Sequence, residues 1–249
     1  MTSDFKQCKG IIAVLDILGF SEKIKLLTNQ ENLNEIENIT SSLKEIELKF
    51  SNKAHGIACS IISDTIVIST KDHSADGYVS IFTSIARLAH ELFNHGLIFR
   101  GYVTHGIFCH NEQESVIVGD AFISAYKAEQ ERCIFSIVLV NINDNEIDRP
   151  SSLSGNVFAY DEALISPNDF LVTERDGEKA LNLLGTMYHF SNFFNNFNGI
   201  QILKKIISEG LKSENEKIRA KYIWLGNDLK QFIQSAYPDN AFELTIGLD

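Results

Sequence analysis

The chain has 249 residues, enough for one large domain or two small ones with a sizeable core. Its hydrophobic fraction of 44% and charged fraction of 22% are typical of a soluble globular protein, and its net charge of −11 argues against a nucleic-acid-binding surface, which would need a basic stripe. No apolar run approaches the ~20 residues that span a bilayer, and the N-terminus lacks a secretory signal, so we expect a cytoplasmic protein without a membrane partner.

The first quarter of the chain predicts a strand, a helical region and a β-hairpin. Residues 10–16 form a continuous apolar run that ends on Asp16, which is typical of a buried strand. Apolar side chains then recur at helical spacing over residues 21–50 and predict one or two helices with a polar outer face. Residues 56–70 hold two runs of β-forming residues, so we expect a hairpin with Asp64 at its turn.

The alternation of helices and strands continues to residue 140. The predicted segments are an amphipathic helix at 75–95, strands at 97–108 and 115–118, a helix at 119–131 and a buried strand at 134–140. The resulting order, β-α-β-β-α-β-β-α-β, predicts an α+β sheet with its helices on one face.

The pattern changes after residue 141, where a loop-rich stretch leads into three helical segments. These segments lie near residues 178–197, 200–211 and 216–237. We therefore expect one core at residues 1–145 and a loop and helical C-terminal extension at residues 146–249 that packs on this core.

Asp16 and Asp64 are the residues that point most directly to a chemical function. Each stands at the end of a β-like run, so neighbouring strands would bring both carboxylates to one edge of the sheet. Hard divalent cations such as Mg²⁺ or Mn²⁺ bind paired carboxylates, and substrate phosphates complete their coordination. The competing explanation is that each aspartate merely caps a strand or a turn, where this residue is common.

The turn after Asp16 adds a second feature of a phosphate site. Gly19, Phe20 and Ser21 lead from the predicted strand into a helical segment. The backbone N–H groups of Phe20 and Ser21 would point outward at the N-terminus of that helix, where phosphate groups bind readily. An ordinary strand–helix connection explains the same residues, so the turn by itself is a weak signal.

Four motifs along the chain resemble those of one enzyme family in the family's own order. They are V-L-D-I-L-G-F-S at 14–21, S-D-T-I-V-I-S at 63–69, F-R-G-Y-V-T-H-G at 99–106 and G-D-A-F-I-S-A-Y-K-A-E at 119–129. Together they resemble the metal-binding loop, the second-aspartate hairpin and the following strand and helix of the class III nucleotidyl cyclases. This resemblance covers roughly residues 10–140.

The resemblance implies a fold, an assembly and a reaction. The fold is a ferredoxin-like core, and the assembly is a head-to-tail homodimer with two active sites at its interface. The reaction converts a nucleoside triphosphate into a 3′,5′-cyclic monophosphate and pyrophosphate, with two Mn²⁺ or Mg²⁺ ions in each site. The metal-binding residues that it implies are Asp16, Ile17 and Asp64.

Four positions depart from the family pattern. Ile123 stands where the family has its transition-state Asn, and Lys127 stands where it has its transition-state Arg. Lys127 keeps the charge but lacks the planar fork of a guanidinium. The family's purine-reading Lys falls on Ser60, and the Asp that assists it falls on Val116. A purine pocket built from those two side chains is therefore absent.

The chain more closely resembles the bacterial pyrimidine cyclases of the Pycsar antiphage systems. The similar residues are Arg100, Gly101, Gly106, Gly119, Ala121, Ala125, Tyr126 and Glu129, with looser similarity in the C-terminal region. This resemblance implies that the protein makes cyclic UMP or cyclic CMP on infection and that a separate effector protein senses the product. We favour UTP slightly over CTP as the substrate.

Several side chains keep two explanations. Arg100 reaches a phosphate or stabilises the dimer interface, or it forms only a structural salt bridge. Tyr126 and Ser60 face the nucleotide, or Tyr126 packs its helix against the sheet. Lys127 supplies the transition-state cation from the partner subunit, or it is an ordinary exposed lysine.

Two other functions remain open at this point. The loss of the Asn at Ile123 favours an inactive, cyclase-like module that only binds nucleotide or dimerises, although the retained aspartate pair argues against it. The other is an adenylate or guanylate cyclase with an unusual base pocket.

Overall fold

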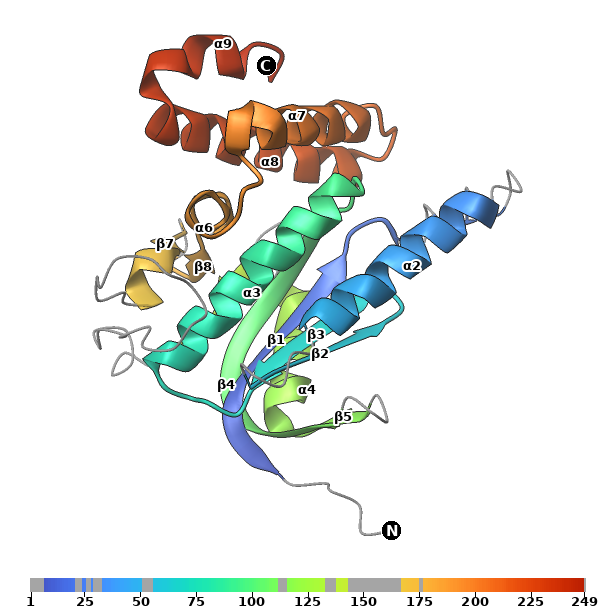
Figure 1. Ribbon diagram of the computed structural model, residues 1–249, viewed down its shortest axis with the longest axis vertical. Helices are drawn as coiled ribbons and strands as arrows, with labels where there is room; N and C mark the ends of the chain where they lie inside the picture. The colour runs from blue at the N-terminus through green and yellow to red at the C-terminus, as the bar shows by residue number, and fades with distance from the viewer. Residues whose placement is uncertain are drawn as a thin grey trace.

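A computed structural model defines the fold (Figure 1). It describes residues 7–20, 24–25, 28, 33–50, 56–111, 116–132, 138–142, 167–174 and 177–248. Within these ranges no helix is long and apolar enough to cross a membrane.

The N-terminal part has the predicted order of strands and helices. Its elements are β1 (Cys8–Ile17), α2 (Leu33–Phe50), β2 (Ile57–Ile62), β3 (Thr65–Thr70), α3 (Ala75–Asn94), β4 (Phe99–Asn111), β5 (Val116–Val118), α4 (Asp120–Arg132) and β6 (Val138–Val140). The sheet order is β2-β3-β1-β4 with antiparallel neighbours throughout, which is the ferredoxin-like arrangement. The expected α+β fold class is confirmed.

Strand β1 lies at the centre of the sheet and is buried on both faces. Ile11, Ala13 and Leu15 pack with α2 and α3 in the larger core, whereas Ile12 and Val14 pack on the opposite face. This alternation follows from the period of two residues in a strand. A strand covered on both faces requires an apolar side chain at nearly every position, which explains the continuous apolar run in the sequence.

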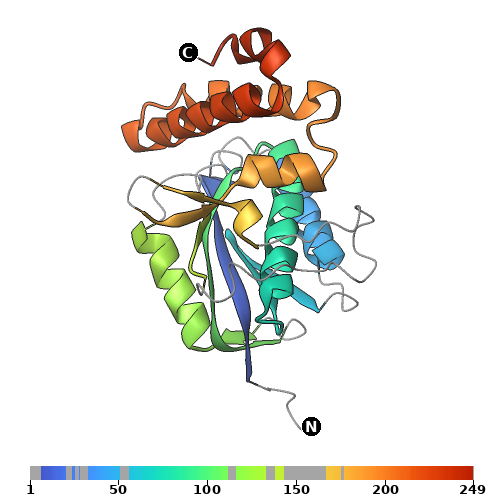
Figure 2. The ribbon, with the colours of Figure 1, turned by 90° about the vertical axis from the view of Figure 1, so that its left-hand side faces the viewer.

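The prediction that all helices cover one face of the sheet is wrong. Helices α2 and α3 cover one face, and α4 covers the other, where its Ala121 and Ala125 pack with Tyr102 and Phe108 (Figure 2). The small alanine side chains allow a close approach, since a Cβ on Gly106 of β4 would lie 3.1 Å from the Ala121 Cβ. Helix α4 can therefore sit directly on the bent end of β4.

The C-terminal part extends the same sheet before it becomes helical. Its elements are β7 (Leu171–Thr173), β8 (Lys179–Leu181), α6 (Leu183–Phe190), α7 (Asn198–Gly210), α8 (Glu216–Ala236) and α9 (Ala241–Thr245), with short 3₁₀ turns at Pro167–Phe170, Asn195–Phe197 and Pro238–Asn240. The sheet continues from β4 through β6 and β8 to β7. The boundary predicted between residues 145 and 146 lies outside the described residues.

The helix expected over residues 178–197 is only partly correct. Gly177 adopts a left-handed φ of 87° in a tight turn, and this turn pairs β7 with β8 as a hairpin. The helix begins only after Asn182, whose side chain accepts a hydrogen bond from the Gly185 amide. The helices expected near 200–211 and 216–237 are confirmed as α7 and α8.

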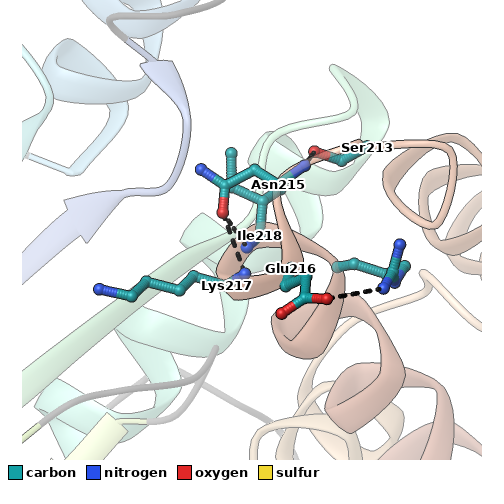
Figure 3. Close-up of polar contacts among 6 residues, drawn as sticks. Ser213, Asn215, Glu216, Lys217 and Ile218 are labelled. Atoms are coloured by element: carbon teal, nitrogen blue, oxygen red, sulfur yellow. Dashed lines mark hydrogen bonds and ion pairs between the residues drawn. The ribbon is translucent and has the colours of Figure 1, made fainter.

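Helices α7 and α8 lie across one end of the sheet (Figures 1 and 2). They pack against each other and join the larger core through Leu203 and Ile207 of α7 and Leu225 and Leu229 of α8. Helix α8 begins at Asn215, whose side-chain oxygen accepts hydrogen bonds from the amides of Lys217 and Ile218 at 3.0 and 3.4 Å (Figure 3). This cap fixes the start of α8.

Candidate active site

Asp16 and Asp64 lie at one edge of the sheet, on neighbouring strands. Asp16 is the penultimate residue of β1 and pairs with Thr65 of β3, and Asp64 is in the two-residue turn that joins β2 to β3. The Ile17 amide donates a hydrogen bond to the Asp64 carbonyl at 2.8 Å and ties the turn to the end of β1. The turn has a positive φ of 60° at Ser63, as short hairpin turns require.

A shared arginine lies beside the Asp16 carboxylate. Arg100 of β4 is directly opposite Asp16 in the register of β1 and β4. Its Nε donates a hydrogen bond to Asp16 Oδ2 at 3.3 Å and lies 2.7 Å from Oε1 of Glu129. Glu129 is on the sheet-facing side of α4, with a side chain that is only 4% exposed. One guanidinium therefore offsets two carboxylates, one of them deeply buried.

Burial dominates the electrostatics of this cluster. It raises the pKa of Asp16, while Arg100 lowers that pKa and the nearby Asp64 carboxylate raises it. Burial likewise raises the pKa of Glu129, with Arg100 acting against it and Asp16 adding to it. Both carboxylates are therefore harder to ionise than in water, and additional positive charge at this edge would favour their ionised forms.

The donor atoms at this edge suit a hard divalent cation. Asp16 and Asp64 offer carboxylate oxygens whose charges repel each other, and Ile17 has no side-chain donor, so it can contribute only its backbone carbonyl. Within the described part of the chain no three His, Cys, Asp or Glu side chains form a metal-binding group. Two aspartates thus leave the rest of a coordination shell to backbone, water and phosphate oxygens.

The predicted phosphate-binding turn follows β1. The Leu18 amide bonds to the Ile98 carbonyl at 2.8 Å, and Gly19 then takes a left-handed φ of 72° with open space around its Cα. Phe20 turns back and packs against the larger core. Ser21 lies outside the described residues, so its predicted role stays a prediction.

Lys127 and Tyr126 point away from Asp16 within one chain. Both are exposed, as is Ile123 one turn earlier, whereas Glu129 on the opposite side of the helix is buried. Residues at positions 127 and 129 differ by about 200° around a helix, so they cannot face the same element. Lys127 is therefore available only to a group outside its own subunit core.

The two positions aligned with the purine-reading pair hold no ionisable side chain. Ser60 is 1% exposed, and its hydroxyl lies 2.8 Å from Nε2 of His110, whose Nδ1 lies 2.8 Å from the hydroxyl of buried Ser69. Val116 pairs with Asn111, next to His110, in the β4–β5 ladder. The Ser60 hydroxyl is thus held inside the protein, and His110 is the partly exposed member of this trio.

Sequence reasoning did not assign a role to Glu129 or His110. Helical spacing places Glu129 on the same face of α4 as Ala121 and Ala125, and that signal is readable in the sequence. The contact of His110 with Ser60 and Ser69 depends on how β4 bends over the sheet, which no local pattern predicts.

Sequence comparisons find no family model and no curated protein that matches this chain. Structure comparison finds overall similarity to solved adenylyl cyclases. CyaB from P. aeruginosa aligns over 55% of this chain and 78% of its own, at 14% identity and a TM-score of 0.41. Two structures of a bacterial light-regulated adenylyl cyclase align at 20% and 19% identity, with TM-scores of 0.39 and 0.40. The chain spans 44% of the length of each light-regulated protein, and similarities this weak leave function to be argued from the site.

Proposed function

We propose that the protein is a metal-dependent nucleotidyl cyclase that converts a pyrimidine nucleoside triphosphate, UTP or CTP, into its 3′,5′-cyclic monophosphate and pyrophosphate. The observation that carries this proposal is the junction of Asp16 and Asp64, where the Ile17 amide and the Asp64 carbonyl are 2.8 Å apart. The sequence resemblance supports the finer parts: Mn²⁺ or Mg²⁺ as cofactor, UTP favoured over CTP, and a second-messenger role in antiphage defence with a separate effector.

The reaction is an intramolecular phosphoryl transfer. The ribose 3′-oxygen forms a bond to the α-phosphorus, the bond from that phosphorus to the pyrophosphate oxygen breaks, and the 3′-hydroxyl proton passes to solvent. The chemistry that bound divalent ions supply is charge neutralisation of the phosphates and a lower pKa of the 3′-hydroxyl. Asp16, Asp64 and the Ile17 carbonyl would hold those ions, and Arg100 holds the Asp16 carboxylate in place.

The base pocket supports a pyrimidine. Ser60 and Val116 replace the Lys and Asp that would hydrogen-bond a purine, and the Ser60 hydroxyl is already bound to His110. Ser60 is about 12 Å from Asp16 by strand geometry, two strands across and two residues along, which is within the span of one nucleotide. A site without the specific purine hydrogen bonds discriminates poorly in favour of a purine.

A homodimer with composite sites is part of the proposal. Lys127 and Tyr126 face outward from α4, where a partner subunit would meet them. Exposed apolar side chains lie on the same helix and on β4 and β5, among them Ile107, Val118 and Ile123. Such a surface suits burial against a second copy of the chain.

The test is to incubate the purified protein with Mn²⁺ or Mg²⁺ and all four NTPs together and to identify the cyclic products by mass spectrometry. We expect a pyrimidine product to exceed the purine products at least ~10-fold, or ~1.4 kcal/mol of differential transition-state binding. Asp16→Asn and Asp64→Asn should each retain less than about a tenth of the wild-type rate, with circular dichroism unchanged. Cyclic AMP or cyclic GMP as the main product would replace the pyrimidine assignment with a purine one.

One observation favours a second candidate, an inactive nucleotide-binding module. Arg100 donates to the same Asp16 carboxylate that a metal would need, and Ile123 cannot donate a hydrogen bond to a transition state. This candidate predicts that calorimetry detects NTP binding while no NTP is consumed with either metal.

A further inference from the structure

The N-terminal turns of α8 overhang the end of the sheet that carries Asp16. Figures 1 and 2 both show α8 crossing beyond the C-terminal end of β1, and in Figure 2 one end of α8 projects to the side of the sheet covered by α4. The Asp16, Arg100 and Glu129 cluster is on that same side, since Asp16 alternates with Ile12 and Val14 and pairs with α4 through Arg100. The helix therefore begins beside the candidate active site.

Lys221 faces the body of the protein from the second turn of α8. It lies one helical turn before Leu225, which is buried with Leu229 in the larger core. Residues four apart share a helix face, so Lys221 continues the buried stripe of α8 toward the end of β1. Arg219, two residues earlier, lies on the other side of the helix, 4.0 Å from the Glu216 carboxylate and 43% exposed.

The charge of Lys221 acts on the site directly. Together with Arg100, the Lys221 ammonium favours the ionised form of Asp16, which lowers the pKa of that carboxyl against the effect of burial. Arg100 is already engaged by Asp16 and Glu129. A triphosphate that enters this edge brings more negative charge, and a lysine ammonium is a good point charge for phosphate oxygens.

We infer that Lys221 binds the triphosphate of the substrate, so that the C-terminal extension supplies a phosphate-binding residue to the site on its own chain. The inference rests on the proposed function for the identity of the substrate, but its central element is a phosphate site. It gives the extension a direct role in binding. Lys217, one turn earlier on α8 and exposed, extends the same cationic line (Figure 3).

The experiment compares Lys221→Ala with Arg219→Ala, which removes the same charge from the same helix on the opposite side. Calorimetry with inorganic tripolyphosphate and Mg²⁺ measures binding, and steady-state kinetics with the preferred NTP measures turnover. Lys221→Ala should weaken tripolyphosphate binding and lower kcat/KM roughly 10- to 100-fold, as expected for a lost charged hydrogen bond. Arg219→Ala should stay within about twofold of wild type. Lys221→Arg should recover most of the lost affinity.

Each result separates the inference from the proposed function. If the wild type makes cyclic nucleotide and Lys221→Ala is as active and binds as tightly, the inference is wrong and the function stands. If no NTP is cyclised but tripolyphosphate binding requires Lys221, the function is wrong and the phosphate site stands. A wild type that does not bind tripolyphosphate, or an equal loss in Arg219→Ala, overturns the inference, with circular dichroism confirming that each variant is folded.

Discussion

Arg100 is the residue on which the geometry of the candidate site depends. Its Nε lies between a metal-binding candidate, Asp16, and a buried carboxylate, Glu129, at 3.3 and 2.7 Å. The contact with Glu129 is an ion pair without hydrogen-bond geometry, because Glu129 Oε1 has no hydrogen-bond partner. The guanidinium thus serves both the stability of the α4 contact and the orientation of Asp16.

Arg100→Ala should destabilise the protein in a pH-dependent way. Without the guanidinium, burial raises the pKa of Glu129 further, so the cost is small near pH 5, where Glu129 can protonate, and grows as the pH rises. We expect a loss of about 3 kcal/mol in the free energy of unfolding at pH 8, within the range for breaking a buried pair. Urea denaturation at pH 5 and pH 8 measures it.

The double variant Arg100→Ala/Glu129→Gln is the control for this prediction. Replacing the carboxylate by a neutral amide removes the uncompensated charge, so the double variant should be more stable at pH 8 than Arg100→Ala alone. An equal loss at both pH values, or no recovery in the double variant, would contradict the electrostatic explanation.

The individual site residues differ in how far the sequence predicts them. Asp16 and Asp64 are visible because each ends a β-like run, and the outward direction of Lys127 follows from helical spacing. The pairing of Asp16 with Arg100 is a matter of register between β1 and β4, 84 residues apart in sequence. Long-range register leaves no local pattern, which is why the salt bridge was one of two explanations for Arg100.

At the scale of elements, the trio of Ser60, Ser69 and His110 joins the bent end of β4 to β2 and β3. The two serine hydroxyls are buried, and each has a ring nitrogen of His110 at 2.8 Å. His110→Ala would leave both hydroxyls without this partner. We expect a loss of about 2–4 kcal/mol in the free energy of unfolding, measured by urea denaturation.

A variant that removes all three polar groups tests the cause of this loss. Ser60→Ala/Ser69→Ala/His110→Leu has no hydroxyl left unsatisfied and should be more stable than His110→Ala alone, since replacing both sides of a hydrogen bond costs little. If the triple variant is the less stable of the two, the trio does not act through its hydrogen bonds.

A second element contact should make stability depend on pH. Burial and the Glu174 carboxylate raise the pKa of Asp228 on α8 from 3.8 to about 6. The native state then binds a proton more tightly than the unfolded chain between these values, so this group lowers stability as the pH rises from about 4 to 6.

Asp228→Asn should remove that dependence. The variant should exceed the wild type in free energy of unfolding by at most ~3 kcal/mol at pH 8, which corresponds to the rise from 3.8 to about 6, and should differ little near pH 4. Thermal unfolding at pH 4, 6 and 8 measures the difference. A constant difference across this range would show that Asp228 is not the titrating group.

The prediction for the whole molecule concerns its assembly. If Asp16 and Asp64 of one subunit act with Lys127 of the other, inactive Asp16→Ala and Lys127→Ala chains should complement each other when mixed. Half of the dimers in an equal mixture are mixed, and each holds one intact site of two, so about a quarter of the wild-type activity should return. Activity assays after subunit exchange, with size measured by light scattering, test this outcome.

A mixture of Asp16→Ala and Asp64→Ala chains is the matched control. Both residues belong to the same half of a composite site, so no arrangement of these chains contains an intact site, and no activity should return. Recovery in both mixtures, or in neither while exchange is confirmed, would exclude a composite site that uses Lys127.

The fold of the N-terminal part was predictable because its strands and helices are long and strongly patterned. The side of the sheet on which α4 packs was not, because it depends on the bend of β4 at Gly106 and on the small side chains of Ala121 and Ala125. Strand β8 was mistaken for helix because its three residues, Lys179–Leu181, are too few to show a period.

The pairing of β8 with β6 has a consequence for any attempt to produce the core alone. Leu139 of β6 pairs with Ala180, so the C-terminal segment completes the hydrogen bonding of a strand whose residues, Val138–Val140, are all buried. A protein cut after residue 145 would display that strand as an open, apolar edge. Open edges of this kind recruit strands from other molecules, so such a fragment should form aggregates through β-strand addition.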